Sequence, residues 1–168
     1  MTQLVGHDDL VADFRSAMRR LAATVSIITC ADETGRHGMT ATAVTSVCAD
    51  PPTLLVCINS AARLFPKIPV RKRFCVNLLK TSHVDLSRCF GMRENEQDRF
   101  AIGDWADLEG LPYLRDAQAS LFCSLQRVVQ VGSHGIFIAR IDRINIAREI
   151  EPLIYQNGAY AVTSELAG

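Results

Sequence analysis

The sequence lacks an excess of charge of either sign, and it lacks an apolar run long enough to span a bilayer. Its 168 residues carry 18 Lys and Arg against 18 Asp and Glu. Nucleic acids and anionic membranes attract surplus basic residues, so neither is an expected partner. No apolar run approaches the ~20 residues of a membrane-spanning helix, and Gln3, His7, Asp8 and Asp9 lie where a signal peptide needs a basic and then apolar start. We therefore expect a cytoplasmic protein.

Cysteines and histidines at metal-binding or redox spacing are also missing. The six cysteines are Cys30, Cys48, Cys57, Cys75, Cys89 and Cys123. The four histidines are His7, His37, His83 and His134. No C-x-x-C pair occurs, the histidines lie far apart, and most cysteines lie in apolar runs such as residues 54–58. We expect no bound metal and buried thiols in a reducing compartment, the alternatives being a catalytic thiol, a zinc ligand or a disulfide.

Common catalytic motifs are absent as well. The sequence has no G-x-G-x-x-G after a strand, no G-x-x-x-x-G-K-[ST], no H-E-x-x-H and no G-x-S-x-G. Rossmann, P-loop, zincin and hydrolase sites therefore lose support. Apolar residues make up 48% of the chain, enough for a sizeable core. We expect one domain over residues 1–168.

The first periodic segment predicts an amphipathic helix over residues 8–22. Its apolar side chains recur at spacings of three and four, at Leu10, Val11, Phe14, Met18 and Leu21. Asp8 and Asp9 suit the positive end of such a helix.

The chain from about residue 24 to 162 predicts a series of short strands. We expect strands at 24–30, 39–48, 53–59, 74–79, 118–131, 134–147, 153–155 and 159–162. We expect turns at 32–36, 132–133 and 156–158, a broken helix or loop at 61–70, a helical region at 81–102 with a stop at Gly91, and irregular structure at 103–116. With few strand–helix–strand alternations, this pattern favours a mainly β fold, a closed antiparallel barrel with a few helices, over a doubly wound parallel sheet.

The most distinctive segment is residues 38–46, where hydroxyls alternate with small side chains. Thr40, Thr42, Thr45 and Ser46, together with backbone N–H groups, could bind a phosphate without any lysine. The alternative is an ordinary Thr-rich strand, since branched side chains suit a pleated surface.

Amides and a histidine mark three more candidate positions. Asn59 with Ser60 follows a buried strand, and Asn77 lies inside one, where a buried amide needs a polar partner. The alternative is that each asparagine closes a turn through its own backbone. His134 follows a turn and begins a strand, at what would be a barrel mouth, or it is a structural histidine. In Asp98-Arg99-Phe100, Arg99 is either a site cation or an exposed salt-bridge partner.

Taken in order, these segments resemble the short-chain flavin reductase family, over about residues 14–160. The matching segments are 14–18, 25–29, 38–43, 46–47, 51–52, 55–59, 74–78, 98–100, 132–134 and 153–155. The resemblance implies an FMN-binding split β-barrel, usually a homodimer with the flavin near the subunit boundary. It also implies an enzyme, an NAD(P)H-dependent flavin reductase that transfers a hydride from NADH or NADPH to FMN or FAD and supplies reduced flavin to a separate monooxygenase.

The same resemblance implies a set of site residues. The cofactor-binding residues would be Met39, Thr40, Ala41, Thr42, Ala43, Thr45, Ser46, Asn59, Ser60, Asn77, Leu78, Arg99 and Phe100. His134 matches a family histidine near the nicotinamide, and we expect it to orient the nucleotide rather than transfer a proton. No residue distinguishes FMN from FAD, or NADH from NADPH.

Three other functions stay open at this point. The flavin could remain bound and reduce another acceptor, such as a corrinoid or a metal chelate. The domain could bind flavin without catalysis, because a fold does not by itself establish a function. It could also be a dimeric interaction domain without a cofactor, which would make the Thr-Ala segment and both asparagines coincidences.

Overall fold

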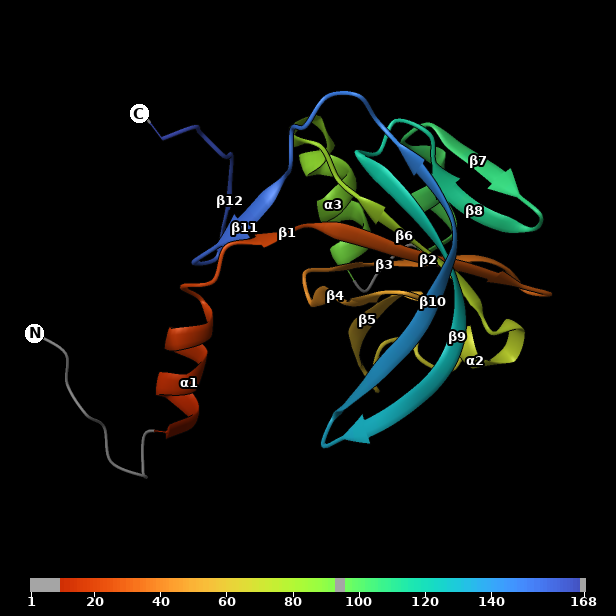
Figure 1. The fold of residues 1–168 in the computed structure, drawn as a ribbon, viewed down its shortest axis with the longest axis horizontal. Coiled ribbons are helices and arrows are strands. Elements are labelled where there is room, and N and C mark those ends of the chain that lie inside the picture. Colours follow the sequence, from red (N-terminus) through yellow and green to blue (C-terminus); the bar gives the residue numbers. More distant parts are fainter. Residues whose placement is uncertain (1–9, 93–95, 167–168) are drawn as a thin grey trace, which may run out of the picture.

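The principal sheet is antiparallel and has seven strands (Figure 1). The computed structural model describes residues 10–92 and 96–166, apart from the side chains of 96–98. The strands of this sheet are β2 (Ser26–Asp32), β3 (Gly35–Ala41), β4 (Val44–Ala49), β5 (Pro52–Asn59), β6 (Arg73–Leu78), β9 (Ala119–Val131) and β10 (His134–Ile146). Their order in the sheet is β3-β2-β6-β9-β10-β5-β4, so β3 and β4 are the two edges. The prediction of a mainly β, antiparallel fold is confirmed.

The two edge strands follow one another in the chain, with only Thr42 and Ala43 between them. The sheet must therefore curl until its edges approach each other at this end. The expected closed barrel is nevertheless wrong, because no β3–β4 ladder forms. The Val44 N–H donates to the Thr42 carbonyl and the Cys57 N–H donates to the Ala43 carbonyl, each at 3.0 Å, so the carbonyls of the crossing serve a tight turn and β5 instead. The single strand predicted over 39–48 is corrected to two strands at opposite edges.

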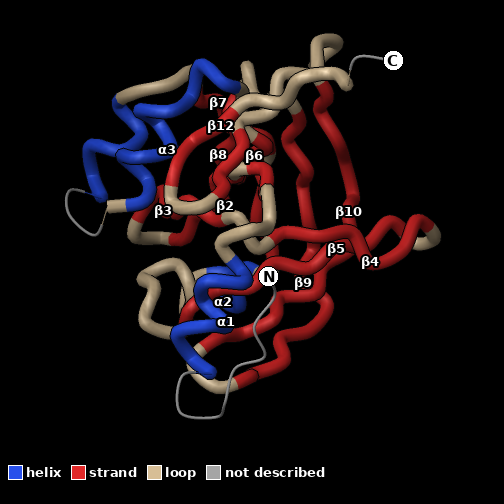
Figure 2. The backbone as a smooth tube through the Cα atoms, turned by 90° about the vertical axis from the view of Figure 1, so that its left-hand side faces the viewer, coloured by secondary structure: helices blue, strands red, loops and turns tan. Residues whose placement is uncertain are grey.

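Smaller elements surround the principal sheet, and all of them except α1 pack near it. The helices are α1 (Leu10–Met18), α2 (Ile68–Arg71) and α3 (Val84–Gly91), with 3-10 turns at Thr81–His83 and Glu96–Ala101. A three-stranded sheet joins β1 (Ala23–Thr24), β11 (Ile154–Gln156) and β12 (Ala159–Ala161), and β7 (Trp105–Leu108) pairs with β8 (Leu111–Leu114). Of the helices described here, none is long and apolar enough to span a membrane. In Figure 2, α3 lies against the part of the molecule that contains β3 and β12.

Most predicted turns and the α3 stop are confirmed, and one region is corrected. Hairpin turns occur between β2 and β3, between β9 and β10, and between β11 and β12, where Asn157 and Gly158 have φ of 51° and 82°. Residues 103–116 are not irregular, because they contain the β7–β8 hairpin. Glu109 and Gly110 form its turn with φ of 55° and 78°, and positive φ at both positions is what a type I′ hairpin turn requires.

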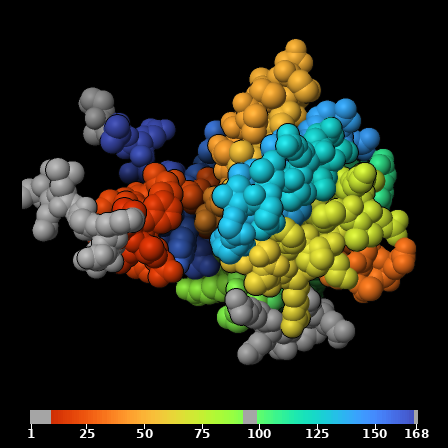
Figure 3. Space-filling model, turned by 90° about the horizontal axis from the view of Figure 1, so that it is seen from below, coloured from red at the N-terminus to blue at the C-terminus, as the bar shows by residue number. Residues whose placement is uncertain are grey.

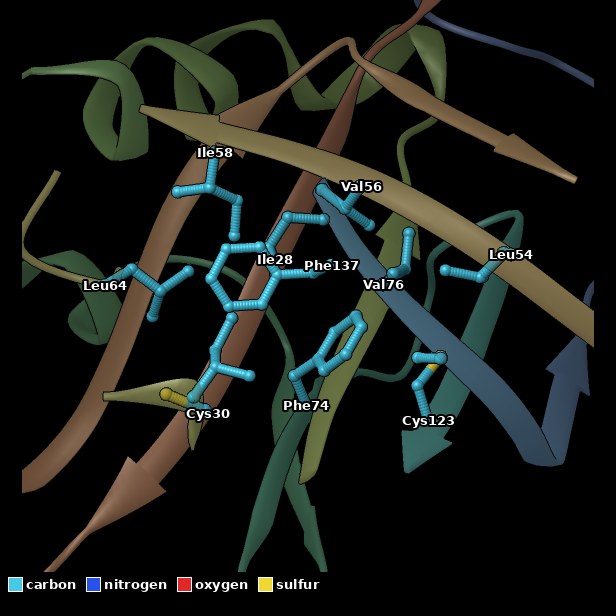
Figure 4. Packing of buried hydrophobic residues seen from close by; sticks show 12 residues of the cluster. Ile28, Cys30, Leu54, Val56, Ile58, Leu64, Phe74, Val76, Cys123 and Phe137 are labelled. Carbon is cyan, nitrogen blue, oxygen red and sulfur yellow. The ribbon is translucent and has the colours of Figure 1, made fainter. Parts of the chain in front are cut away.

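The main hydrophobic core lies inside the curled sheet (Figure 4). Phe74 and Phe137 are completely buried at its centre, among Ile28 and Val56 from neighbouring strands. A second cluster joins α3 to the sheet and includes Phe90 and Phe100. Gly38 of β3 allows this contact, because a Cβ there would lie 2.5 Å from the Phe90 ring.

The cysteines are packing residues for the most part. All six are free thiols, and Cys30, Cys75 and Cys123 are buried, whereas Cys48 is exposed. Burial raises the pKa of both Cys30 and Cys123 to about 12. These two thiols therefore stay protonated at neutral pH and are poor nucleophiles.

The N-terminal helix of the described chain has no buried residue. It was expected over 8–22 and is observed at Leu10–Met18; residues 8 and 9 lie outside the described part. Its apolar side chains are exposed, with Val11 at 66% and Phe14 at 61%. In Figure 1 the helix stands apart from the principal sheet, beside β1 and β11. The predicted amphipathic helix therefore exists, but its apolar side covers no core within the described part of the chain.

A charged cluster ties the β2–β3 hairpin to the loop before α2. Asp32 accepts hydrogen bonds from Lys67 Nζ at 2.9 Å and from the Thr34 hydroxyl at 2.5 Å, and His37 Nε2 lies 2.8 Å from the same carboxylate. The Lys67 contact, followed by those of Thr34 and His37, holds the pKa of Asp32 well below its ordinary value of 3.8. Folding therefore favours the ionised carboxylate.

Acid unfolding should reveal this cluster. The contribution of Asp32 is complete above its ordinary pKa and is lost as the pH falls below that value. We expect Asp32→Asn to lower the urea midpoint at pH 7, and the difference from the wild type to shrink steadily between about pH 5 and pH 2. Glu33→Gln is the matched control, since Glu33 is exposed and its nearest ion pair, with Arg71, is 3.6 Å long. An Asp32→Asn deficit that is the same at every pH would contradict the assignment.

Candidate functional site

A cavity of about 400 Å³, here called the first lobe, opens where β3, the β3–β4 crossing, α3 and the β11–β12 hairpin meet. Its lining residues are Val25, Met39, Thr40, Ala41, Thr42, Ala43, Cys57, Asn59, Ser87, Arg88, Gly91, His134, Tyr155 and Tyr160. Most of the Thr-Ala segment singled out in the sequence therefore forms one wall.

A second lobe of about 430 Å³ lies next to the first. Its lining residues are Gly38, Met39, Thr40, Asn59, Ala61, Ala62, Arg63, Leu64, Phe90, Gly91, Met92 and Arg99. Because the two lobes share Met39, Thr40, Asn59 and Gly91, they form one elongated site. A third cavity of about 520 Å³, between the β2–β3 and β7–β8 hairpins, shares no lining residue with them.

The Thr-Ala segment contributes backbone and small side chains more than free hydroxyls. The Thr40 hydroxyl donates to the Ser87 carbonyl at 2.7 Å, which ties β3 to α3. Ala41 and Ala43 leave room for a flat ligand to lie against the wall. Thr45 and Ser46, which were also expected in the site, are exposed on β4 and line neither lobe.

Asn59 and His134 are brought together at the mouth of the first lobe. They are register partners between β5 and β10, and both are exposed. The Ser60 N–H and hydroxyl both donate to the Ser133 carbonyl, at 2.9 and 3.1 Å, and Ser133 Oγ lies 3.0 Å from His134 Nδ1. The Asn59 side chain accepts the Ala61 N–H at 2.9 Å, so this asparagine closes a turn and lines both lobes. Ser60 itself is not in either lining.

Asn77 and Leu78 are not brought into the site. Asn77 is completely buried between β2, β8 and β9, and Leu78 packs against the main core. The Asn77 amide donates to the Ile27 carbonyl at 3.0 Å, and its oxygen accepts the Leu114 N–H at 2.9 Å and the Ser120 hydroxyl at 3.1 Å. Protein groups, rather than a ligand, satisfy this amide.

Arg99 and Phe100 belong to the wall of the second lobe and to the core that supports this wall. Arg99 is 4% exposed and donates to the carbonyls of Gly38, at 3.1 Å, and Met92. It is thus a buried residue that lines the second lobe, not an exposed salt-bridge partner. Phe100 lies behind it in the second core cluster, edge-on to Phe90 with ring centroids 5.1 Å apart.

Sequence reasoning missed the opposite wall of the first lobe. Ser87, Arg88 and Gly91 come from α3, and Tyr155 and Tyr160 from the β11–β12 hairpin. Ser87 Oγ lies 2.9 Å from the Tyr160 hydroxyl, which joins the two elements. The sequence carried only weak signals of this wall. Gly91 was predicted as a helix stop, and the two tyrosines flank the predicted turn at residues 156–158.

The chemistry of this lining is selective. Among the described residues of both lobes there is no Asp or Glu, whereas Arg88, Arg63 and Arg99 supply positive charge. No cluster of His, Cys, Asp and Glu suited to a metal ion occurs in the described chain. The arrangement can bind a flat ligand that carries anionic groups, and it offers no carboxylate pair for acid–base catalysis.

Comparison with known proteins decides the family. The family model described as "Flavin reductase like domain" matches residues 18–164. This chain belongs to that family. FMN reductase (NADH) RutF of Agrobacterium fabrum is 40% identical over 151 residues, which is 89% of this chain and 87% of the relative. The reductase component of the FADH(2)-dependent resorcinol hydroxylase of a Rhizobium species is 38% identical over 155 residues, 90% of this chain and 87% of the relative.

Solved structures agree with this assignment. The NADH:FAD oxidoreductase SgcE6 of Streptomyces globisporus, solved in complex with NAD and FAD fragments, superposes with a TM-score of 0.89. It is 25% identical, and the match covers 99% of this chain and 100% of that chain. The resemblance to the flavin reductase family predicted from the sequence is therefore confirmed.

The lining residues of this flavin reductase-like domain suit a flavin. Ala41, Ala43 and Gly91 occupy little of the first lobe, and a Cβ added at Gly91 would meet only Thr40, at 3.9 Å. The arginines of the lining match the phosphate groups of FMN or FAD.

Substitution of the two asparagines should separate structure from ligand binding. We expect Asn77→Ala to lower the free energy of unfolding by about 2–4 kcal/mol, because it leaves buried donors unpaired. The folded variant should keep its affinity for FMN. Asn59→Ala, the matched control, should lose flavin affinity and change stability by less than about 1 kcal/mol. Urea titration and flavin fluorescence quenching provide the two readouts. A stable Asn77→Ala protein with impaired flavin binding would reverse the assignment.

Proposed function

We propose that this protein is an NAD(P)H:flavin oxidoreductase that reduces FMN or FAD and releases the reduced flavin to a separate monooxygenase. The observation that carries the proposal is the two-lobed site, which combines small residues along one wall with arginines and no carboxylate among its described lining residues. Two relatives support it by name, one an FMN reductase that uses NADH and one the reductase component of a hydroxylase.

We assign the flavin ring to the wall formed by the β3–β4 crossing. A flavin bound here would supply the redox chemistry, namely the acceptance of a hydride from the nicotinamide. The protein's part is to bind and orient the two rings and to exclude water between them. Met39, Thr40, Ala41, Thr42 and Ala43 form the surface against which the flavin packs.

The remaining predicted residues act at different distances from the ligand. Asn59 contacts the flavin where the lobes join, Arg99 shapes the second lobe, and His134 orients the nicotinamide at the mouth of the first. Ser60, Asn77, Leu78 and Phe100 support these positions indirectly, through their contacts with neighbouring strands and loops. Thr45 and Ser46 line neither lobe.

We further propose that the protein works as a homodimer in the cytoplasm. The apolar side of α1 has no partner within the described chain, and a second copy would cover it. Six free thiols suit a reducing compartment.

Turnover tests the proposed function. Purified protein is mixed with NADH or NADPH in air, and nucleotide oxidation is followed with no flavin, with FMN and with FAD. We expect oxidation far above background that saturates with added flavin, as for a diffusing substrate. Flavin binding without turnover would indicate a storage module or another acceptor, and no flavin binding would refute the proposal.

The role of His134 has its own test. Because His134 lies at the mouth and has no acid–base partner in the described lining, we expect His134→Ala to raise the KM for the nucleotide about tenfold and to leave kcat within about twofold. Ser133→Ala removes only the contact to Nδ1 and should give a smaller change of the same kind. A large loss of kcat at saturating nucleotide would show that the histidine takes part in the chemistry.

The proposed dimer is tested on α1. Phe14→Glu places a charge on the exposed apolar side and should convert a dimer to a monomer in analytical ultracentrifugation, with unchanged circular dichroism. Ser16→Glu adds the same charge two residues further along α1, away from the apolar side, and should remain dimeric. A monomeric wild type, or a dimeric Phe14→Glu variant, would exclude α1 as the contact.

A further inference from the structure

Arg88 is the one permanently charged residue among the described residues that line the first lobe. It lies in the last turn of α3, and its side chain is 57% exposed. None of the described lining residues of this lobe is Asp or Glu. A guanidinium in such a lining attracts an anionic group of any ligand that enters.

The Arg88 side chain is held in a defined place. Its guanidinium carbon lies 5.6 Å from the centre of the Tyr160 ring, within the range of a cation–π contact. The Tyr160 hydroxyl is fixed in turn by Ser87 Oγ at 2.9 Å, and its ring packs edge-on against Tyr155 with ring centroids 5.4 Å apart. The aromatic platform thus presents the cation at the wall of the lobe.

The intramolecular partner of Arg88 leaves most of its binding capacity in place. Asp85 accepts a hydrogen bond from Nη1 at 3.1 Å, but the Asp85 side chain is 91% exposed. An exposed ion pair of this kind is weak, and a guanidinium has five N–H donors. The fork of donors matches two oxygens of one phosphate.

We propose that Arg88 binds a phosphate group of the nucleotide in the first lobe. This inference rests on the proposed function, and two ligands could supply the phosphate: the flavin mononucleotide and the nicotinamide dinucleotide. Arg88 would then set how strongly the site prefers phosphorylated ligands over the bare rings. It would do so without taking part in hydride transfer.

Calorimetry with pairs of ligands tests this role independently of turnover. FMN is compared with riboflavin, which has the same ring without the phosphate, and NADH with 1-benzyl-1,4-dihydronicotinamide, which has no phosphate. We expect Arg88→Ala to weaken at least one phosphorylated ligand about tenfold or more and to leave its phosphate-free counterpart within twofold. Loss for FMN assigns the flavin phosphate, and loss for NADH assigns the dinucleotide.

Two further variants sharpen the result. Arg88→Lys keeps the charge and should recover part of the lost affinity, whereas a role in packing alone would not be rescued in this way. Arg115→Ala removes another exposed arginine, whose ion pair with Asp104 is 3.9 Å long and which lines neither lobe. It should bind all four ligands like the wild type.

The results distinguish a failure of the Arg88 role from a failure of the proposed function. If Arg88→Ala binds all four ligands like the wild type, or weakens the phosphate-free ligands as much as the phosphorylated ones, the role of Arg88 is refuted and the proposed function stands. If the wild type binds none of the four ligands, the proposed function and the role of Arg88 both fail.

Discussion

The two-residue crossing from β3 to β4 is the constraint on which the rest of the structure depends. Thr42 and Ala43 carry the chain from one edge of a seven-stranded sheet to the other. Such a short connection is possible only if the sheet curls until those edges nearly meet, and the curl encloses the main core. It also leaves a break in the wall, where the carbonyls of the crossing are used by a turn and by β5 rather than by a ladder. The first lobe lies along that break. Figure 3 shows, on another face, how far the β4–β5 hairpin then projects from the body of the molecule.

Contacts with β3, at the same edge of the sheet, fix the position of α3. Gly38 lets Phe90 pack directly on β3, the Thr40 hydroxyl bonds to the helix backbone, and Arg99 donates to the Gly38 carbonyl. A buried guanidinium is costly unless hydrogen bonds satisfy it. The carbonyls of Gly38 and Met92 accept such bonds from Arg99, which links β3 to the end of α3. The two lobes therefore lie between a sheet edge and a helix that are fixed to each other by short-range contacts.

Periodicity was enough to predict most strands, because their apolar residues alternate and their turns carry Gly or Asn. Periodicity failed where the pattern of apolar and small residues continues without interruption although the chain crosses from one edge of the sheet to the other. Residues 39–48 contain neither Gly nor Pro, so nothing in the sequence marks the break at Thr42 and Ala43. The β7–β8 hairpin was missed because each of its strands has only four residues, although Glu109-Gly110 is a recognisable turn.

In the candidate site, too, the local sequence pattern does not tell which single residues reach the cavity. Asn59 and Asn77 both belong to apolar strands, yet one ends at the mouth of the cavity and the other lies at the centre of a hydrogen-bond network. Their difference depends on which strands lie next to β5 and β6, which is a property of the whole sheet. Ser87 and Tyr160 are 73 residues apart and meet only in the folded chain.

The walls and the mouth of the site differ in how closely they are tied to the fold. A side chain at Gly38 would lie 2.5 Å from the Phe90 ring of α3, so this position cannot vary without moving the helix or its ring. Arg88 and His134 instead project from the ends of their elements and are exposed, so their replacement leaves the core intact. A reaction that depends on positioning two rings, rather than on a protein acid or base, suits this division. In the proposed reaction the curled sheet would fix where the two rings lie. The exposed Arg88 and His134 would then adjust ligand affinity with little effect on the free energy of unfolding.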